Sequence, residues 1–394
     1  MLSNSYNYVS SGSVEAWSAF MSFCSHTTAA EVDLEALAYN YHQLRQRASP
    51  SVKFLAVVKA DAYGHGAIPV SKKLEELSTD FLGVARVQEG VELRNGGITK
   101  PILVLSGVYQ EEVEEVLAYQ LTPLVYRWEI AEALSAAAGK RGKKIPLHIK
   151  VDTGMGRIGV LAEEAPAFAD RVRKLGNLEI EGIASHLSTA DEGDSAFAEE
   201  QLERFSRTIE ELKKLDIDPP FRHIANSAAL VNLPAAHFTV VRPGIMLYGS
   251  YPSPSLKAKV SLRQVMSWKS RIADLKKLPA GYPISYGRTF ITQRPSLIAA
   301  IPVGYADGYH RLFSNRGEVL IKGMRAPVVG RVCMDWTMAD VTAITGVEVG
   351  DEVVLMGSQS GQEITPEEMG GWIGTISYEI LCSVGKRVPR VYKG

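Results

Sequence analysis

The feature that most constrains the fold is a regular alternation of two kinds of segment between about residues 31 and 250. Short apolar runs rich in β-branched residues alternate with stretches that have the periodicity of amphipathic helices, such as "AIPVSKKLEELS" and "FAEEQLERFSRTIEELKKL". The apolar runs are "FLAVV", "FLGVA", "ILVLSG", "LTPLVY", "LHIKV", "EIEGIAS", "FRHIANS" and "FTVVRPGIMLYG". Repeated strand–helix units of this kind indicate a parallel sheet covered by helices.

Eight units in roughly 220 residues match a closed (β/α)8 barrel, the TIM barrel, in number and length. A doubly wound open sheet is the alternative. Beyond about residue 254 the chain changes to short strand-like runs separated by glycine and proline, as in "GEVLIKGMRAPVVGRV". We therefore expect an N-terminal extension over residues 1–28, an α/β barrel over 29–254 and a mainly β C-terminal domain over 255–394.

Composition and charge exclude several classes of function. The net charge of −1 over 394 residues leaves no electrostatic footprint for nucleic acid or an anionic membrane. The three cysteines, Cys24, Cys333 and Cys382, lack metal-binding spacing and fit a reducing compartment, so we expect a cytoplasmic protein without a metal site. No run approaches the roughly 20 apolar residues of a membrane helix. The first 28 residues lack the basic start of a signal peptide.

A lysine follows the first apolar run, in "FLAVVKADAYGHG". If the barrel prediction holds, Lys59 lies at the carboxyl end of a strand, where barrel enzymes carry their chemistry. A lysine there can also simply extend into solvent. In a partly apolar pocket its amine would have a lowered pKa and would attack an aldehyde readily. Tyr63 follows, and Gly64 and Gly66 permit a close approach of backbone to a ligand.

This stretch resembles the pyridoxal 5'-phosphate (PLP) lysine motif of the alanine racemases. The likeness continues in order through "IKVDTGMGRIG", "EGIASHLSTAD", "ANSAA", "VRPGIMLYG", "SYGRTF", "PVGYADGY", "VGRVCMDWTM" and "YEILCSVGKRVPRVY", and so covers about residues 30 to 392. The resemblance implies a PLP barrel joined to a β domain. It also implies a homodimer with shared active sites that interconverts L- and D-alanine and supplies D-alanine for peptidoglycan.

The resemblance assigns the catalytic groups. Lys59 would bind PLP covalently and act as the base on the D-face of the substrate, and Tyr286 of the partner subunit would act on the L-face. A phenol is protonated at neutral pH and needs polarising neighbours to act as a base. His186 in "ASHLS" and Arg157 in "GMGRIG" resemble the residues that hydrogen-bond and orient this tyrosine. Without the resemblance, Tyr286 would be a turn residue and His186 a core residue.

Further residues would hold the cofactor. Arg242 in "VRPGI" resembles the arginine that faces the ring nitrogen, to which it can donate a hydrogen bond without giving up its own proton. The phosphate would be held by Tyr63, Ser227, Tyr378 and the backbone amides of Gly244 and Ile245. The loops after the seventh and eighth strands are the usual phosphate site of a barrel. Ser227 alone is also explained as the start of a helix.

The remaining assignments concern the substrate and its path. The Met334 backbone amide of the partner subunit and Arg157 would meet the substrate carboxylate. Lys150 in "HIKVDTG" matches a lysine that many family members carry carbamylated, which would turn a cation beside Arg157 into an anion that positions it. The outer access corridor would be formed by Tyr305, Asp191, Arg311 and Arg331.

Other protein classes compete with this interpretation. The stretch "GMGRIG" follows an apolar run and Glu179 lies roughly 20 residues further on, which is a formal dinucleotide-binding fingerprint of an NAD-dependent dehydrogenase. Two features argue against a dinucleotide site. Asp152 lies beside the glycines, where a pyrophosphate would have to approach, and the motif falls in the fifth strand–helix unit of a barrel and not at the start of a doubly wound sheet. A non-catalytic PLP-binding protein would consist of a barrel alone, and the second domain, which carries Tyr286 and Met334, argues against it. A racemase for serine or a broader range of amino acids and a decarboxylase of related fold are further alternatives.

Overall fold

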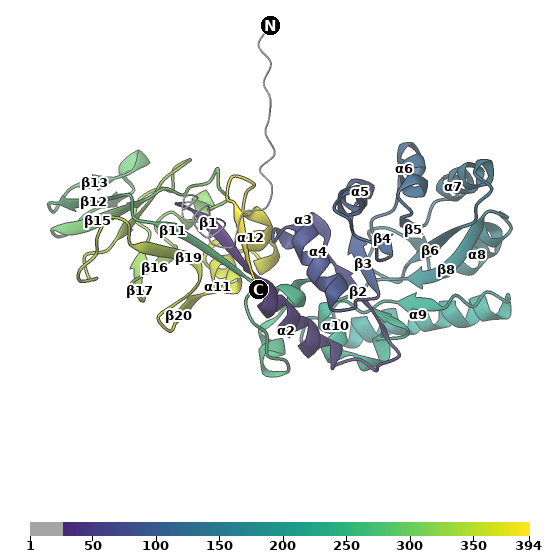
Figure 1. The fold of residues 1–394 in the computed structure, drawn as a ribbon. Helices are drawn as coiled ribbons and strands as arrows, with labels where there is room; N and C mark the ends of the chain where they lie inside the picture. The colour runs from purple at the N-terminus through teal and green to yellow at the C-terminus, as the bar shows by residue number, and fades with distance from the viewer. Residues whose placement is uncertain (1–26) are drawn as a thin grey trace, which may run out of the picture.

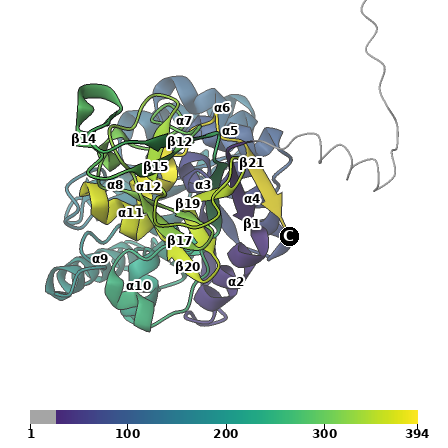
Figure 2. The same cartoon turned by 90° about the vertical axis from the view of Figure 1, so that its left-hand side faces the viewer.

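The computed structural model describes residues 27–394. The extension expected over residues 1–28 lies outside the described residues except for its last two positions. The chain forms two lobes that lie side by side (Figure 1), and Figure 2 views the smaller lobe from its outer end. Within residues 27–394, no helix is long and apolar enough to cross a membrane.

The larger lobe is a nearly closed parallel barrel, which confirms the predicted fold class and excludes the doubly wound alternative. Eight strands pair in the order β10-β2-β3-β4-β5-β6-β8-β9, and β7 (Val160–Leu161) pairs with β6 outside this path. Backbone bonds from Thr239 N to Arg222 O (3.2 Å) and from Arg242 N to Ala225 O (3.1 Å) link the two ends of the sheet. The strands are β2 (Lys53–Val57), β3 (Phe81–Val84), β4 (Ile102–Val104), β5 (Thr122–Val125), β6 (Ile145–Asp152), β8 (Leu178–Ala184), β9 (Phe221–His223) and β10 (Val240–Val241).

Each of the eight predicted runs overlaps one of these strands, and the amphipathic stretches form helices around them. In α9, Phe205, Ile209 and Leu212 are buried on one face, while Glu200 and Arg204 pair at 2.6 Å outside. The helices of this lobe are α2 (Leu34–Arg45), α3 (Lys59–Tyr63), α4 (Ala67–Glu76), α5 (Val87–Asn95), α6 (Val113–Ala118), α7 (Trp128–Lys140), α8 (Ala165–Arg173), α9 (Ala196–Lys214) and α10 (Ser227–Asn232). Short 3₁₀ turns complete it: η1 (Gln110–Glu112), η2 (Pro234–Ala236), η3 (Ile245–Tyr248) and η4 (Pro254–Ala258).

The smaller lobe is mainly β, as predicted. Its strands are β11 (Met266–Arg271), β12 (Asp274–Leu278), β13 (Pro283–Ile284), β14 (Phe290–Ile291), β15 (Ser296–Ile301), β16 (Glu318–Ile321), β17 (Met324–Pro327), β18 (Thr337–Asp340), β19 (Glu352–Gln359), β20 (Gln362–Ile364) and β21 (Arg390–Lys393). Two helices, α11 (Pro366–Ile373) and α12 (Ser377–Ser383), and two 3₁₀ turns, η5 (Tyr286–Arg288) and η6 (Arg311–Phe313), accompany them.

The strand β1 (Ala29–Asp33) ties the two lobes together. It pairs antiparallel with β11 and parallel with β21, so residues 29–33 belong by hydrogen bonding to the sheet of the smaller lobe. The helix α2 then returns to the barrel. The first and last strands of the described chain therefore lie next to each other, and the C-terminal segment is held near the barrel (Figure 1).

One buried side chain secures the return of the chain to the barrel. Asn40 on α2 donates from Nδ2 to the carbonyls of Leu247 (3.0 Å) and Arg263 (2.7 Å). Its Oδ1 accepts from the Arg263 amide at 2.7 Å. The carboxamide thus satisfies three backbone groups between the end of the barrel and β11.

We predict that Asn40→Ala destabilises the protein by about 2 kcal/mol, because it leaves buried backbone groups without partners. This corresponds to a fall of roughly 2–4 °C in the midpoint of thermal unfolding, measured by calorimetry or circular dichroism. Asn95→Ala, at an exposed position in α5, is the matched control and should leave the midpoint unchanged. Equal midpoints for the two variants would contradict the role given to Asn40.

Candidate active site

Lys59 lies just beyond the end of β2, at the carboxyl-end mouth of the barrel. The four residues that follow, 60–63, have φ between 52° and 54° and form a left-handed turn. This conformation costs non-glycine residues roughly 1–2 kcal/mol each, so the surrounding structure has to hold it. Gly64, with φ of 82°, ends the turn at little cost.

Two side chains, His65 and Arg390, bind carbonyls at the end of this turn. The buried ring of His65 lies 3.0 Å from the carbonyls of Ala62 and Tyr63 through Nδ1, which carries a proton because both partners are acceptors. Arg390, on β21 of the smaller lobe, donates from Nε to the carbonyl of Gly64 at 3.0 Å. The segment that carries Lys59 is thus clamped between barrel and C-terminal strand.

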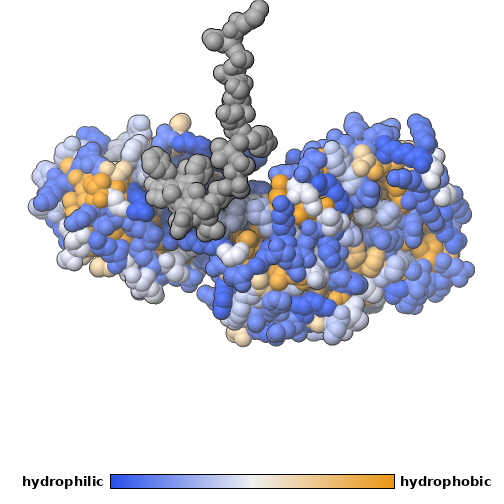
Figure 3. All heavy atoms as spheres, in the orientation of Figure 1, coloured by the Kyte–Doolittle hydropathy of each residue, from blue (hydrophilic) through white to orange (hydrophobic). Residues whose placement is uncertain are grey.

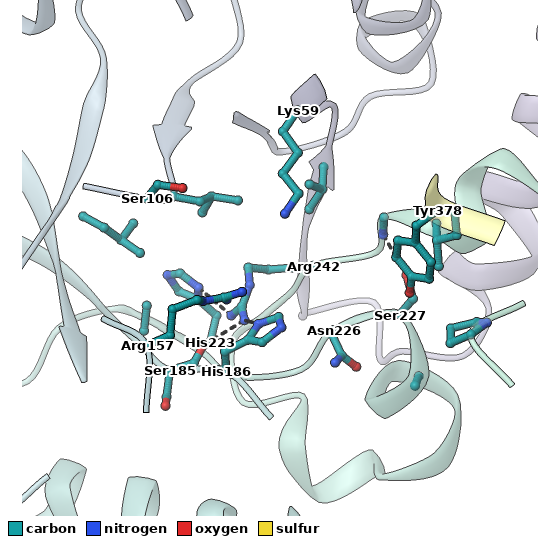
Figure 4. A pocket seen from close by; sticks show the side chains of 18 of the residues that line it. Lys59, Ser106, Arg157, Ser185, His186, His223, Asn226, Ser227, Arg242 and Tyr378 are labelled. Carbon is teal, nitrogen blue, oxygen red and sulfur yellow. Dashed lines mark hydrogen bonds between the residues drawn. The ribbon is translucent and has the colours of Figure 1, made fainter. Parts of the chain in front are cut away.

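A cavity of about 440 Å³ opens at this mouth, a size typical of small-molecule sites (Figure 4). Figure 4 shows the Lys59 side chain entering from one side, Arg157 and His186 across from it, and Ser227 beside Tyr378 at one end. Most of the site residues predicted from the sequence line this cavity: Lys59, Tyr63, Lys150, Arg157, His186, Asp191, Ser227, Arg242, Gly244, Ile245 and Tyr378.

Arg242 is buried at the centre of a hydrogen-bond network (Figure 4). Its guanidinium donates to His223 Nδ1 at 2.9 Å and to His186 Nδ1 at 3.1 Å. It also donates to the carbonyls of Ser185 (2.8 Å) and Ile224 (3.1 Å). A guanidinium has donors only, so both Nδ1 atoms accept. Each neutral imidazole therefore carries its proton on Nε2, and His186 keeps an N–H donor.

The network continues away from the cavity. His223 Nε2 lies 2.7 Å from Nδ1 of His148, whose Nε2 faces the Glu181 carboxylate at 3.5 Å. Burial lowers the pKa of both histidines, which stay neutral. The donors therefore point in one direction, from Arg242 outward through two imidazoles to a carboxylate.

Burial and positive neighbours lower the pKa of the amines in the cavity. For Lys59, burial is the largest cause and the Arg157 charge the next. For Lys150, burial followed by the Arg242 charge lowers the pKa to about 7. Burial also lowers the pKa of Arg242, to about 10, so that it remains charged at neutral pH. A weakly protonated amine is a good nucleophile, and the cavity as a whole favours anionic ligands.

The end of the cavity near α10 is suited to a phosphate. The amide of Gly244 donates to Ser227 Oγ at 2.8 Å. A Cβ at Gly244 would lie 2.7 Å from the hydroxyl of Tyr63, so a larger residue here would displace that hydroxyl. The ring of Tyr378, from α12 of the smaller lobe, lies 6.1 Å from that of Tyr63 between centroids. Hydroxyls from three separate elements line this end.

The glycine-rich loop that precedes Arg157 is organised by one carboxylate. Asp152 Oδ1 accepts from the amides of Gly154 (2.9 Å), Met155 (2.9 Å) and Gly156 (3.2 Å). Burial opposes its ionisation, but these amides lower the pKa of Asp152. A dinucleotide would need the same amides for its pyrophosphate. Because these amides already donate to Asp152, and because the loop belongs to a barrel, the structure does not support the dehydrogenase alternative.

The other predicted site residues lie on the smaller lobe and do not line the barrel cavity: Tyr286, Tyr305, Arg311, Arg331 and Met334. Tyr286 is 71% exposed and lines a separate groove of about 620 Å³ together with Cys333 and Trp336. Figure 3 shows apolar side chains gathered at this end of the lobe, over β12 and β15. The Tyr305 amide bonds to the Cys333 carbonyl at 3.0 Å, which places Tyr305 next to Met334.

Sequence reasoning missed His148 and His223. Both fall inside predicted strands, in "LHIKV" and "FRHIA", where an imidazole must find a hydrogen-bond partner once buried. Two such positions in a barrel core were a signal for a buried network. Among residues 27–394 there is no group of three or more histidine, cysteine or acidic side chains arranged to hold a metal ion.

Fold and site together describe a parallel barrel with a lysine amine in the cavity at its mouth, joined to a mainly β domain. The family models for the N-terminal and C-terminal domains of alanine racemase match residues 32–252 and 265–392. The chain belongs to the alanine racemase family of amino-acid isomerases, which depend on PLP. This confirms the resemblance of the sequence motifs.

Relatives match over nearly the whole chain. The alanine racemase of Halothermothrix orenii is 49% identical over 93% of this chain and 97% of its own length. The enzyme of Geobacter sulfurreducens is 46% identical over 93% and 97%. Among solved structures, alanine racemase from Clostridium difficile 630 has a TM-score of 0.89 at 38% identity, over 94% and 96%. The enzyme from Bartonella henselae, with covalently bound pyridoxal phosphate, has a TM-score of 0.83 at 31% identity, over 93% and 100%.

We predict that the Lys150 amine titrates near pH 7 in the folded protein. Because its pKa is lowered, the amine is mainly neutral above that pH and charged below it. Labelling with acetic anhydride in CO₂-free buffer across a pH series, with mass spectrometry of proteolytic peptides, measures the midpoint. The urea-unfolded protein is the control and should give the ordinary value of about 10.4. A midpoint near 10 in the folded protein would contradict the prediction.

Proposed function

We propose that the barrel cavity holds PLP on Lys59 and that the enzyme racemises alanine with two bases, Lys59 and Tyr286 of a partner chain. The observation that carries the proposal is the meeting, in one cavity, of an amine of lowered pKa, a hydroxyl-lined end and the Arg242 guanidinium. The residues present fit this cofactor, because Lys59 would suit its aldehyde, the hydroxyl-lined end its phosphate and Arg242 its ring nitrogen.

When bound, PLP supplies an aldehyde for a primary amine and a conjugated ring that accepts the electron pair released at the substrate Cα. The chain supplies the proton transfers. With a lowered pKa, the Lys59 amine can take a proton from the D-face at neutral pH and return it. Two bases on opposite faces are the economical arrangement for inverting one carbon.

His186 is suited to support the second base. Its Nδ1 is occupied by Arg242, and its pKa lies well below the ordinary value through burial and that charge. It is therefore a neutral N–H donor at Nε2, able to stabilise a phenolate from Tyr286. Arg157, in the same cavity, would add positive charge toward the phenol and the substrate carboxylate.

The remaining residues would bind and orient. Arg242 would donate to the ring nitrogen and keep its proton, since its pKa is about 10. The phosphate ligands would be Tyr63, Ser227, Tyr378 and the amides of Gly244 and Ile245. The substrate carboxylate would also meet the Met334 amide of the partner chain. The access corridor would be formed by Tyr305, Asp191, Arg311 and Arg331.

We infer that Lys150 becomes carbamylated. The side chain is buried, and a pKa of about 7 leaves much of the amine neutral and able to attack CO₂ at physiological pH. The carbamate would replace a cation among Arg157 and Arg242 with an anion, and so relieve their repulsion.

The assembly and biological role are further proposals. The exposed Tyr286 and the apolar groove beside it suit a homodimer in which each barrel cavity receives the second domain of the other chain. We also propose a division into barrel and second domain near residue 254, a cytoplasmic location and a supply of D-alanine for peptidoglycan.

We predict that purified protein forms D-alanine from L-alanine in an assay coupled to D-amino-acid oxidase, and acts little on other members of an L-amino-acid panel. Tyr286→Phe should lower the rate by about a hundredfold or more, as expected for loss of one general base. Lys59→Ala should abolish it. Comparable rates on serine or many other amino acids would instead favour the broad-range alternative.

We predict that two damaged variants complement each other. If each site takes Lys59 from one chain and Tyr286 from the other, a Lys59→Ala chain paired with a Tyr286→Phe chain leaves one site intact. After random reassociation about a quarter of all sites should be intact, and activity should recover to that fraction. Each variant reassociated alone is the control. No recovery in confirmed heterodimers would contradict shared sites.

A further inference from the structure

Glu89, on α5, makes an unusual set of contacts with the segment that carries Lys59. One carboxylate oxygen accepts from the Ala60 amide at 2.7 Å, and Ala60 is the first residue of the left-handed turn. The other oxygen accepts from the amides of Ala85 (2.6 Å) and Arg86 (3.0 Å), at the end of β3. A single side chain thus joins two neighbouring strand ends at the mouth of the barrel.

Helix capping explains only part of this. A glutamate at the third position of a helix commonly accepts a hydrogen bond from the backbone amide of the residue that caps the helix. The contact of Glu89 with the Arg86 amide is of this kind. The Ala60 contact is different, because that amide belongs to another strand–helix unit, 29 residues earlier. Ala60 has φ of 53°, which alanine adopts only when other groups hold it.

Within the turn, the Ala62 amide donates to the Val58 carbonyl at 2.8 Å, and the side-chain contacts of His65 and Arg390 act at its far end. His65 and Arg390 bind carbonyls at residues 62 to 64, whereas Glu89 binds the amide directly after Lys59. Glu89 therefore contacts the backbone at the point where the strand changes hand, one residue after Lys59. Its negative charge also acts on Lys59, against the stronger effect of burial.

We propose that Glu89 is a positioning residue for Lys59: by holding the Ala60 amide, it keeps the left-handed turn in place and the amine directed into the cavity. This inference rests on the proposed role of Lys59 in holding PLP. Glu89 itself does not line the cavity, so it acts through the backbone.

The test compares Glu89→Gln with Glu92→Gln, a control at an exposed position one turn further along α5. A carboxamide has one acceptor oxygen in place of two and presents an N–H₂ donor to the other amides. Hydrogen exchange of the full chain without PLP, followed by mass spectrometry, reports on peptides that cover residues 58–66 and 84–86. Titration with PLP gives its dissociation constant, and steady-state kinetics gives kcat and KM.

We expect exchange in residues 58–66 to rise about tenfold in Glu89→Gln, with PLP binding weaker by about tenfold and kcat reduced while KM for alanine changes less than about twofold. Exchange in α9 should not change, nor should any value for Glu92→Gln. Unchanged exchange in residues 58–66, or unchanged PLP binding despite faster exchange, would overturn the proposal.

The experiment distinguishes failure of the proposed function from failure of the role given to Glu89. If wild-type protein binds no PLP, the proposed function fails, whereas normal binding by both wild type and Glu89→Gln overturns only the role of Glu89. If Glu89→Gln does not fold, Glu89→Asp replaces it, because it keeps the charge and can still cap α5. Its shorter side chain should release Ala60, so exchange should rise in residues 58–66 and not in 84–86. Equal protection of both peptides would overturn the proposal.

Discussion

Positive charge concentrated in one cavity governs the chemistry that this protein can perform. Lys59, Lys150, Arg157 and Arg242 line one cavity, and Asp191 is the one acidic side chain among its described lining residues. The pKa values of both lysines fall as a result, with burial as the first cause and the neighbouring guanidinium groups next. The cavity therefore offers a nucleophilic amine and attracts anions, which are the two properties that a phosphorylated aldehyde and an amino-acid carboxylate require.

The direction of the hydrogen bonds in the cavity matters for its chemistry as much as the charge does. Arg242 can only donate, so it fixes the tautomers of His186 and His223 and leaves the first of these with a donor at Nε2. The left-handed turn fixes Lys59 in a similar way, through contacts to its backbone. Because β1 and β21 pair in the same sheet, the C-terminal strand reaches the barrel mouth and contributes to the clamp. The second domain is thus part of the site within its own chain, through α12 and β21.

The sequence predicted the barrel and most of the cavity well, for identifiable reasons. Parallel strands buried on both faces give apolar runs, so all eight could be counted, and the carboxyl end of the first run indicated the place of Lys59. Arg242 was placed by the family resemblance. The pairing of β1 with the second sheet could not be predicted, because a five-residue strand carries no information about its partner.

The left-handed turn and the contacts of Glu89 were also beyond sequence reasoning. Alanine and aspartate give no sequence signal for a positive φ. A glutamate near the start of a helix is already explained as part of the helix cap, so it does not indicate a contact with another segment. Tyr286 is exposed on the smaller lobe and lies outside the barrel cavity of its own chain.

Borohydride reduction of the purified protein, followed by mass spectrometry of its peptides, tests whether PLP is tethered to the Lys59 amine. We expect one pyridoxyl adduct per chain, on the peptide that contains Lys59. An adduct on Lys150 instead, or no adduct in protein that is otherwise folded, would contradict it.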